Sequence, residues 1–237
     1  MFKIEKYLYT FESNFKLLTV VLILLCCILV LTCAKESDWI VLFDGTSTDS
    51  WRGFQRQDFP TDGWKIENGS LKTVVGGDQC DIITKDKFKD FELEVEWRVS
   101  PGGNSGIFYR VTEDYPAVWQ SAPEMQVLDD SLHNDGKDSK TSAGSLYALI
   151  APINKMLQPV GEYNKAKVLV KGNHVEHWLN GIKILEYEFV SDDLLNLIAE
   201  SKFKDFSGFA KAKEGYIALQ HHSEEAWYRN IRIRPIK

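Results

Sequence analysis

Cysteine is almost absent beyond the N-terminal region of this 237-residue chain. Three of the four cysteines, Cys26, Cys27 and Cys33, lie within the first 33 residues, which leaves Cys80 alone in the remainder. A disulfide within the remainder is therefore excluded, as is a C-x-x-C redox or zinc motif. Cys80 has no base partner near it in the sequence, so we interpret it as a bystander.

The usual signatures of several large enzyme classes are also missing. The sequence has no G-x-S-x-G elbow, no P-loop and no H-E-x-x-H helix, which argues against the serine hydrolases, nucleotide-binding proteins and zinc peptidases that these motifs mark. The stretch "GGNSG" (102–106) lies between two predicted strands, so it is interpreted as a turn and not as a dinucleotide fingerprint.

Positive charge is not concentrated anywhere in the chain. The formal net charge is −6, and the lysines and arginines are scattered without a basic stripe, which argues against a nucleic-acid partner. There is likewise no linker rich in Pro or Ser, no internal repeat and no low-complexity tract beyond residue 38. One domain is therefore predicted over residues 39–237.

A long apolar run is present only near the N-terminus. The segment "LLTVVLILLCCILVLTC" (17–33) ends in a lipobox-like Val30-Leu31-Thr32-Cys33. Residues 1–33 are predicted to be a signal or lipoprotein segment lipidated at Cys33, with an uncleaved membrane anchor as the alternative. Residues 34–38 would be a tether. Either interpretation predicts an exported protein on the periplasmic or cell-envelope face, held at the membrane.

Period-2 alternation dominates the rest of the sequence. In "FELEVEWRV" (91–99) apolar and charged residues alternate, as in a strand with one solvated face. Asn68-Gly69 and Asn180-Gly181 separate alternating runs, which is typical of type I′ hairpins. A single helix is predicted in "SDDLLNLIAESKF" (191–203). The pattern predicts an all-β sandwich of two antiparallel sheets with one short helix.

The strand in "PEMQVLDD" (123–130) carries polar groups on one side. Glu124 and Gln126 share a face, and Asp129 joins them if a bulge shifts the register. The spacing is similar to the Glu-x-Asp-x-x-Glu strand of jelly-roll glucanases, in which paired carboxylates act as nucleophile and acid. Gln126 in the central position argues against that retaining mechanism. A solvated outer face is the alternative.

Three further stretches offer candidate binding residues. Arg110 shares a predicted face with glycine and phenylalanine, which suits a groove floor, although a snorkelling arginine is equally consistent. Gln220 and His222 share one face of "YIALQHH" (216–222). His133 lies in a polar stretch that is either a binding loop or a solvated one. The seven tryptophans and nine tyrosines could fill a core or line a sugar-stacking groove.

Seven stretches, taken in order, resemble the 3-keto-disaccharide hydrolase family. They are "LFDGTSTDSW" (42–51), "GGNSGIFYR" (102–110), "PEMQVLDD" (123–130), "GSLYALIAP" (144–152), "GEYNKAKVLVKGNHVEHWLNG" (161–181), "SKF" (201–203) and "GYIALQHHSEEAWYRNIRI" (215–233). The resemblance implies a concanavalin A-like jelly-roll and a carbohydrate partner. It also implies cleavage of glycosides whose C3 hydroxyl has been oxidised to a ketone.

A C3 ketone acidifies the C2 proton, so such cleavage can proceed by proton abstraction, elimination and hydration. This route needs a base near C2, a donor or metal near the ketone oxygen, and an acid near the leaving oxygen. The roles are assigned as follows: Glu124 as base or acid with Asp129 as its partner, His222 with His133 as alternate for the acid or ketone-polarising group, and Arg110, Gln126, Gln220, Tyr147 and Trp119 as substrate-binding residues.

The sequence is consistent with more than one answer on two points. One is whether a divalent ion is held by Glu124, His133 and His222, where it would stabilise an enolate. The other is the class of protein. A non-catalytic carbohydrate-binding module or a conventional glucanase-like glycosidase on unoxidised sugars would suit the same fold.

Overall fold

The computed structural model describes residues 39–236, and the residues from Trp39 onward form one compact unit. The predicted signal or anchor segment (1–33), the lipidation of Cys33 and the tether (34–38) lie outside the described residues. None of the helices within residues 39–236 is long and apolar enough to cross a membrane.

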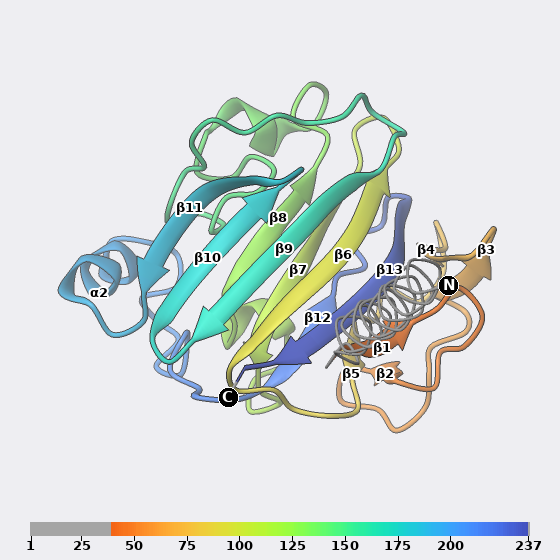
Figure 1. The fold of residues 1–237 in the computed structure, drawn as a ribbon, viewed down its shortest axis with the longest axis horizontal. Coiled ribbons are helices and arrows are strands. Elements are labelled where there is room, and N and C mark those ends of the chain that lie inside the picture. The colour runs from red at the N-terminus through yellow and green to blue at the C-terminus, as the bar shows by residue number, and fades with distance from the viewer. Residues whose placement is uncertain (1–38, 237) are drawn as a thin grey trace, which may run out of the picture. The chain divides into compact units, whose positions relative to one another are not determined.

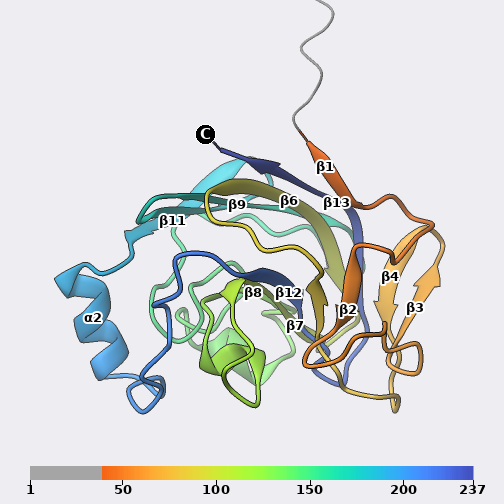
Figure 2. The same cartoon turned by 90° about the horizontal axis from the view of Figure 1, so that it is seen from below.

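Two antiparallel sheets are stacked face to face (Figures 1 and 2). The larger has the strand order β11-β10-β9-β6-β13-β4-β3, with β1 also paired to β13, and the smaller has the order β2-β5-β12-β7-β8. The strands are β1 (Ile40–Phe43), β2 (Trp51–Gly53), β3 (Trp64–Glu67), β4 (Ser70–Thr73), β5 (Ile82–Thr84), β6 (Phe91–Val99), β7 (Asn104–Val111), β8 (Glu124–Leu128), β9 (Asn164–Lys171), β10 (His174–Leu179), β11 (Ile182–Glu188), β12 (Tyr216–Leu219) and β13 (Ala226–Pro235).

Apolar and charged side chains alternate between the two faces of β6, as predicted. Its apolar residues are buried between the sheets, and its glutamates lie on the outer face, where each pairs with an arginine of β13. Arg229 Nε lies 2.8 Å from Glu96 Oε2, and Arg232 Nη2 lies 2.6 Å from Glu94 Oε2. Exposed pairs of this kind contribute about 0–1 kcal/mol each, so burial of the apolar face is the main stabilising term for this strand.

Both predicted Asn-Gly turns are present. Asn68 and Gly69 have φ values of 49° and 72°, and Asn180 and Gly181 have φ values of 50° and 85°. Positive φ at both central residues is the mark of a type I′ turn, which matches the twist of the flanking strands. These turns connect β3 to β4 and β10 to β11 in the larger sheet.

Three of the tryptophans are buried in the core between the sheets. Trp51, Trp64 and Trp97 are each about 1% exposed, so for these residues the core alternative is correct. His177 is fully buried there, with Nε2 2.7 Å from the Tyr109 hydroxyl and Nδ1 3.1 Å from the Gly144 carbonyl. Burial lowers the pKa of His177 to about 4, so the ring is neutral at physiological pH.

The predicted helix is shorter than its sequence pattern. Helix α2 spans Asp192–Ala199, and its N-cap Ser191 accepts a hydrogen bond from the Leu194 N–H at 3.2 Å. It packs beside β11 at the edge of the molecule (Figure 1). Two 3-10 turns, Val118–Gln120 and Asn134–Lys137, complete the helical elements of the described chain. The helix ends before Lys202, which leaves that residue in the following turn.

Candidate active site

A cavity of about 150 Å³ lies on the face of the smaller sheet that points away from the main core. Its wall combines residues from β7, β8, the segment after β12 and three loops: Asn104, Trp119, Glu124, Gln126, Tyr147, Lys202, Gln220 and His222. Six of these were predicted as site residues from the sequence, namely Glu124, Gln126, Gln220, His222, Tyr147 and Trp119. The structure therefore brings most of the predicted set together.

Strand register explains why these residues meet. Gly106 of β7 is opposite Gln126 of β8, and the Gln220 N–H donates to the Gly106 carbonyl at 3.0 Å from the other side. The neighbouring residues Ile107, Met125 and Leu219 point into the main core. Because side chains alternate, the polar residues all lie on the opposite face.

Glu124 lies directly over a glycine of the neighbouring strand. A Cβ built on Gly106 would stand 2.2 Å from Glu124 Oε1, so any larger residue at position 106 would displace the carboxyl. Glu124 itself is only 7% exposed. Burial raises its pKa to about 8, the positive charge of Lys202 opposes this, and Asp81 and Asp135 reinforce it. A carboxyl with a pKa near the working pH is suited to proton transfer.

Lys202 places a positive charge at the rim of the cavity. The residue is exposed overall, yet its ammonium group lies 4.3 Å from the ring centre of Tyr147 and 5.3 Å from that of Trp119. Burial lowers the pKa of Lys202, while Glu124 and Asp135 counteract the effect. The Tyr147 hydroxyl donates to Asp135 Oδ2 at 3.0 Å, which holds that ring in place.

Substitution of Lys202 by Met should move the acidic limb of the pH profile to higher pH. The charge of Lys202 lowers the pKa of Glu124, so its loss leaves less of the Glu124 carboxylate ionised at neutral pH. We expect kcat/KM at pH 7 to fall about tenfold and to recover in part at higher pH. Profiles of kcat/KM for Lys202→Met and for the exposed control Lys204→Met would test this, and an unmoved limb would contradict it.

Asn104 contributes an unpaired acceptor to the cavity wall. It is 4% exposed, and its Oδ1 atom is buried without a hydrogen bond to any described residue. Buried polar atoms are normally paired, so an unpaired one in a cavity wall indicates contact with water or a ligand hydroxyl. Gln126 is more constrained, since its Nε2 donates to the Thr141 carbonyl at 3.3 Å.

Three predicted site residues, Asp129, Arg110 and His133, are not wall residues of this cavity. β8 ends at Leu128, and the Asp129 carboxylate accepts hydrogen bonds from Gly102 N–H at 2.7 Å and Ser131 N–H at 2.9 Å. Burial alone would raise the pKa of Asp129, but these hydrogen bonds outweigh it and lower the pKa. Asp129 therefore stabilises a turn, and its assignment as the partner of Glu124 is corrected.

The prediction that Arg110 forms the groove floor is also corrected. Arg110 has a φ of 57° at an irregularity between β7 and β12, and this turns its side chain away from the face of Gly106. Its Nη2 donates to the Gly172 carbonyl at 2.6 Å, and its guanidinium packs over the Phe189 ring at 4.3 Å. Arg110 therefore ties the two sheets together at the end of β9 and does not line the cavity.

His133 lies next to the cavity but outside its wall. Its ring packs edge-on against His222, with centres 6.2 Å apart, and its Nδ1 accepts from the Asp135 N–H at 3.1 Å. His222 is exposed at the rim, with Nδ1 3.0 Å from Glu224 Oε2. His133 is thus packed against His222, and only His222 of the two is a wall residue.

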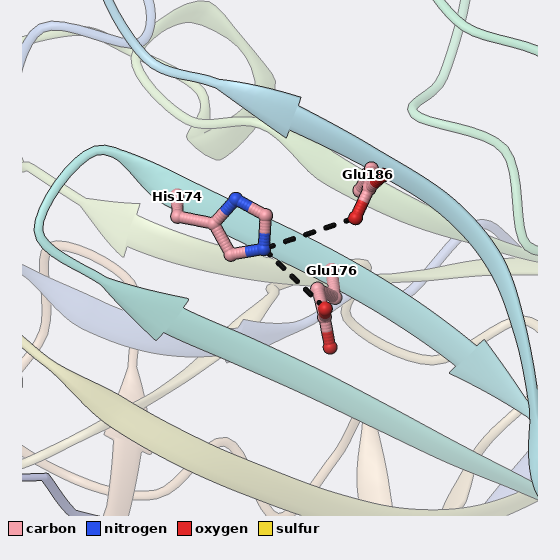
Figure 3. Close-up of side chains that lie close together, drawn as sticks. All are labelled: His174, Glu176 and Glu186. Atoms are coloured by element: carbon pink, nitrogen blue, oxygen red, sulfur yellow. Dashed lines mark hydrogen bonds and ion pairs between the residues drawn. The ribbon is translucent and has the colours of Figure 1, made fainter.

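The predicted metal ligands are not gathered around one point. Among residues 39–236, three ligand atoms of His, Cys, Asp or Glu lie within 4.8 Å of one another only at His174, Glu176 and Glu186. That cluster lies on β10 and β11 of the larger sheet (Figure 3), and Lys183 already pairs with both carboxylates at 3.2 and 2.6 Å. The ligand atoms of Glu124, His133 and His222 do not form such a group, so we derive no step through a metal ion.

Two wall residues were missed by sequence reasoning. Lys202 stands in "SKF" (201–203) and Asn104 in "GGNSG" (102–106), both of which resembled family motifs without suggesting a role. Asn104 looked like part of a turn, whereas it opens β7. A search for polar residues at strand ends beside glycine would have found it.

Comparison with known proteins places the chain in a family. A model of the 3-keto-alpha-glucoside-1,2-lyase-like domain matches residues 38–234. The chain belongs to this family. A 3-keto-disaccharide hydrolase of Bacteroides thetaiotaomicron is 37% identical over 226 residues, which cover 83% of this chain and 78% of that protein. The prediction of an enzyme that acts on glycosidic bonds is confirmed.

Solved structures agree with the fold. A candidate glycosyl hydrolase of Parabacteroides distasonis aligns with a TM-score of 0.77 and 29% identity, covering 84% of this chain and 94% of the other. A non-specific endo-beta-1,3(4)-glucanase of family GH16 aligns with a TM-score of 0.50 and 9% identity, covering 84% and 92%, which speaks for the fold alone. The predicted jelly-roll of two antiparallel sheets is confirmed for this family member.

Proposed function

We propose that the protein cleaves 3-keto-glycosides such as 3-keto-disaccharides by C2 proton abstraction, elimination and hydration. The observation that carries the proposal is that Glu124 is the only carboxylate in the described wall of the cavity, where it is buried and has a pKa of about 8. A retaining glycosidase needs two carboxyl groups about 5–5.5 Å apart. The other polar wall residues are amides, a lysine, a histidine and a tyrosine.

The wall supplies most of what elimination requires. In its ionised form Glu124 removes the C2 proton, which the C3 ketone has made acidic. Negative charge then develops on the ketone oxygen, and Lys202 and His222 can donate N–H groups to it from the rim. Departure of the C1 oxygen leaves a C1=C2 double bond, and water adds across it to give the free 3-keto sugar. Asn104 Oδ1 is available to accept from a sugar hydroxyl.

The decisive assay compares a 3-keto-disaccharide with its unoxidised parent in D₂O. Cleavage of only the keto sugar, with deuterium incorporated at C2, is the expected result, because removal of the C2 proton precedes loss of the leaving group. Cleavage of the parent would instead indicate a conventional glycosidase, and binding without cleavage of either would indicate a carbohydrate-binding module. A parallel reaction after exhaustive chelation tests the metal alternative, which full activity would remove.

A further inference from the structure

A second, larger cavity lies beside the start of β5 in the smaller sheet. It has a volume of about 400 Å³, and its polar wall residues are Gln55, Arg56, Asp78, Gln79 and Asp81. The first cavity, at about 150 Å³, is small for a disaccharide, since ligand sites are commonly about 300–1,000 Å³. Of the two cavities, the second has a volume within that range.

Asp81 lines this second cavity. It directly precedes β5, in which Ile82 is opposite Leu219 and Ile83 is opposite Ala218. The same register places Asp81 opposite Gln220. Ile82 points into the main core, so the Asp81 side chain points to the face that carries Gln220 and Glu124. One row across four strands thus reads Asp81, Gln220, Gly106 and Gln126.

This row sets the separation between two carboxyl groups. The Glu124 carboxyl lies over Gly106, and Gly106 is two strands away from Asp81. Neighbouring strands are about 4.8 Å apart, so the backbones of Asp81 and Gly106 are about 10 Å apart. The two carboxyls affect each other, since Asp81 raises the pKa of Glu124.

The Asp81 carboxyl has a free oxygen atom and a pKa near neutrality, so it can both give and take a proton. Within the described chain, its only hydrogen bond comes from the His221 N–H, which donates to Oδ1 at 2.9 Å, so Oδ2 is available. Burial raises the pKa of Asp81 to about 7, while this hydrogen bond and the nearby His222 lower it. Arg56, an arginine in the same cavity wall, is paired with Asp78 at 2.5 Å.

We propose that Asp81 is the general acid that protonates the glycosidic oxygen, and that the leaving half of the substrate occupies the 400 Å³ cavity. This inference rests on the proposed function and replaces Asp129 as the second carboxyl group. The reacting form has Glu124 ionised and Asp81 protonated, which is the less populated singly protonated form because the pKa of Asp81, about 7, lies below that of Glu124, about 8. In the first half-reaction Glu124 takes the C2 proton, the C1–O bond breaks and Asp81 gives its proton to the departing oxygen. In the second, Asp81 takes a proton from the water that adds at C1, and Glu124 returns its proton to C2. Both groups regain their starting states, and the sum is hydrolysis.

The test separates leaving groups that need a proton from those that do not. In Asp81→Asn we expect turnover of a 3-keto-disaccharide to fall about 100-fold, because an alkoxide leaves poorly without an acid. Turnover of nitrophenyl 3-keto-glucoside should stay within about threefold, since nitrophenolate departs unaided. Deuterium exchange at C2 should persist, since Glu124 is intact. Asp81→Glu, which keeps an acid, should retain more disaccharide turnover than Asp81→Asn.

Several outcomes would overturn the proposal. One is unchanged turnover of the disaccharide by Asp81→Asn. Another is an equal loss of turnover on both substrates in a variant whose melting temperature equals that of the wild type. The nitrophenyl substrate itself reports whether the variant is folded, and Asn can still accept the His221 N–H. Asp86→Asn, at an exposed position beyond β5, is the matched control. If wild-type protein cleaves neither keto substrate and does not exchange C2, the proposed function fails instead.

Discussion

Replacement of Glu124 by Gln should lower kcat/KM for a 3-keto-disaccharide by about 10³-fold and abolish deuterium exchange at C2. A positioned general base contributes about 10²–10⁴-fold, and no other carboxylate in the described wall of the cavity could substitute for this one. Gln has nearly the same shape, so it should keep the packing over Gly106. Turnover and exchange measured on the same preparation would check both parts.

The same variant should be more stable than wild type at neutral pH. The pKa of Glu124 is about 8 in the folded protein against an ordinary 4.5, so the unfolded chain loses this proton first as pH rises. Stability is therefore fully present below about pH 4.5 and is lost as pH approaches 8, by on the order of 3 kcal/mol at pH 7. Gln carries no ionisable proton and escapes this loss. Melting temperatures at about pH 4 and about pH 8 should diverge between the two proteins only at the higher pH.

Glu214→Gln is the matched control, because Glu214 is exposed and lies outside the cavity wall. It should change neither turnover nor the pH dependence of melting. Retained turnover in a folded Glu124→Gln variant would remove Glu124 as the base. A lower melting temperature of Glu124→Gln at the higher pH would show that the carboxylate form is stabilised by the protein, contrary to the burial argument.

Substitution of Gly106 by Val should have an effect of similar size without touching any ionisable group. The new Cβ would occupy the space of the Glu124 carboxyl, 2.2 Å from Oε1 and 2.9 Å from Cδ, so the base must move away from C2. Displacement by about 1 Å can cost about 10²-fold, and complete displacement should approach the loss in Glu124→Gln. Valine is favoured in strands, and the three nearest atoms to the new Cβ all belong to Glu124, so we expect the fold to persist.

A double-mutant cycle gives this prediction its control. If the introduced valine acts only by displacing Glu124, then the loss in the Gly106→Val, Glu124→Gln double variant should equal that of Glu124→Gln alone. Additive losses in folded protein would show that Gly106 serves another role, such as close approach of the sugar to the backbone.

Local sequence patterns were sufficient for most of the fold. Alternation in residues 91–99 and the two Asn-Gly turns predicted strands and hairpins, because period and turn chemistry are local properties. The predicted helix was too long at its C-terminal end, because the chain forms a turn after Ala199. Arg110 and Asp129 were misplaced because a positive φ and the end of a strand change which face a side chain occupies, and neither can be read from residue order.

The candidate site depended on information that residue order does not contain. Glu124 and Gln126 were found because they are two positions apart on one strand. Asp81 could be related to them only through the strand order β5-β12-β7-β8, which no local pattern encodes. Lys202 required knowledge of where α2 ends and which rings its ammonium group meets.

The polar row also has a consequence for folding. It consists of Asp81, Gln220, Gly106 and Gln126. Its members are separated by long stretches of sequence and meet only through sheet pairing. Hairpins such as β3-β4 and β10-β11 can form early from local contacts, but they contain no residue of the row. Pairings between distant segments are the slow part of β-sheet folding. Recovery of catalysis during refolding is thus a measure of the pairing of β5, β12, β7 and β8, and no fragment that lacks β5 or β12 can assemble the row.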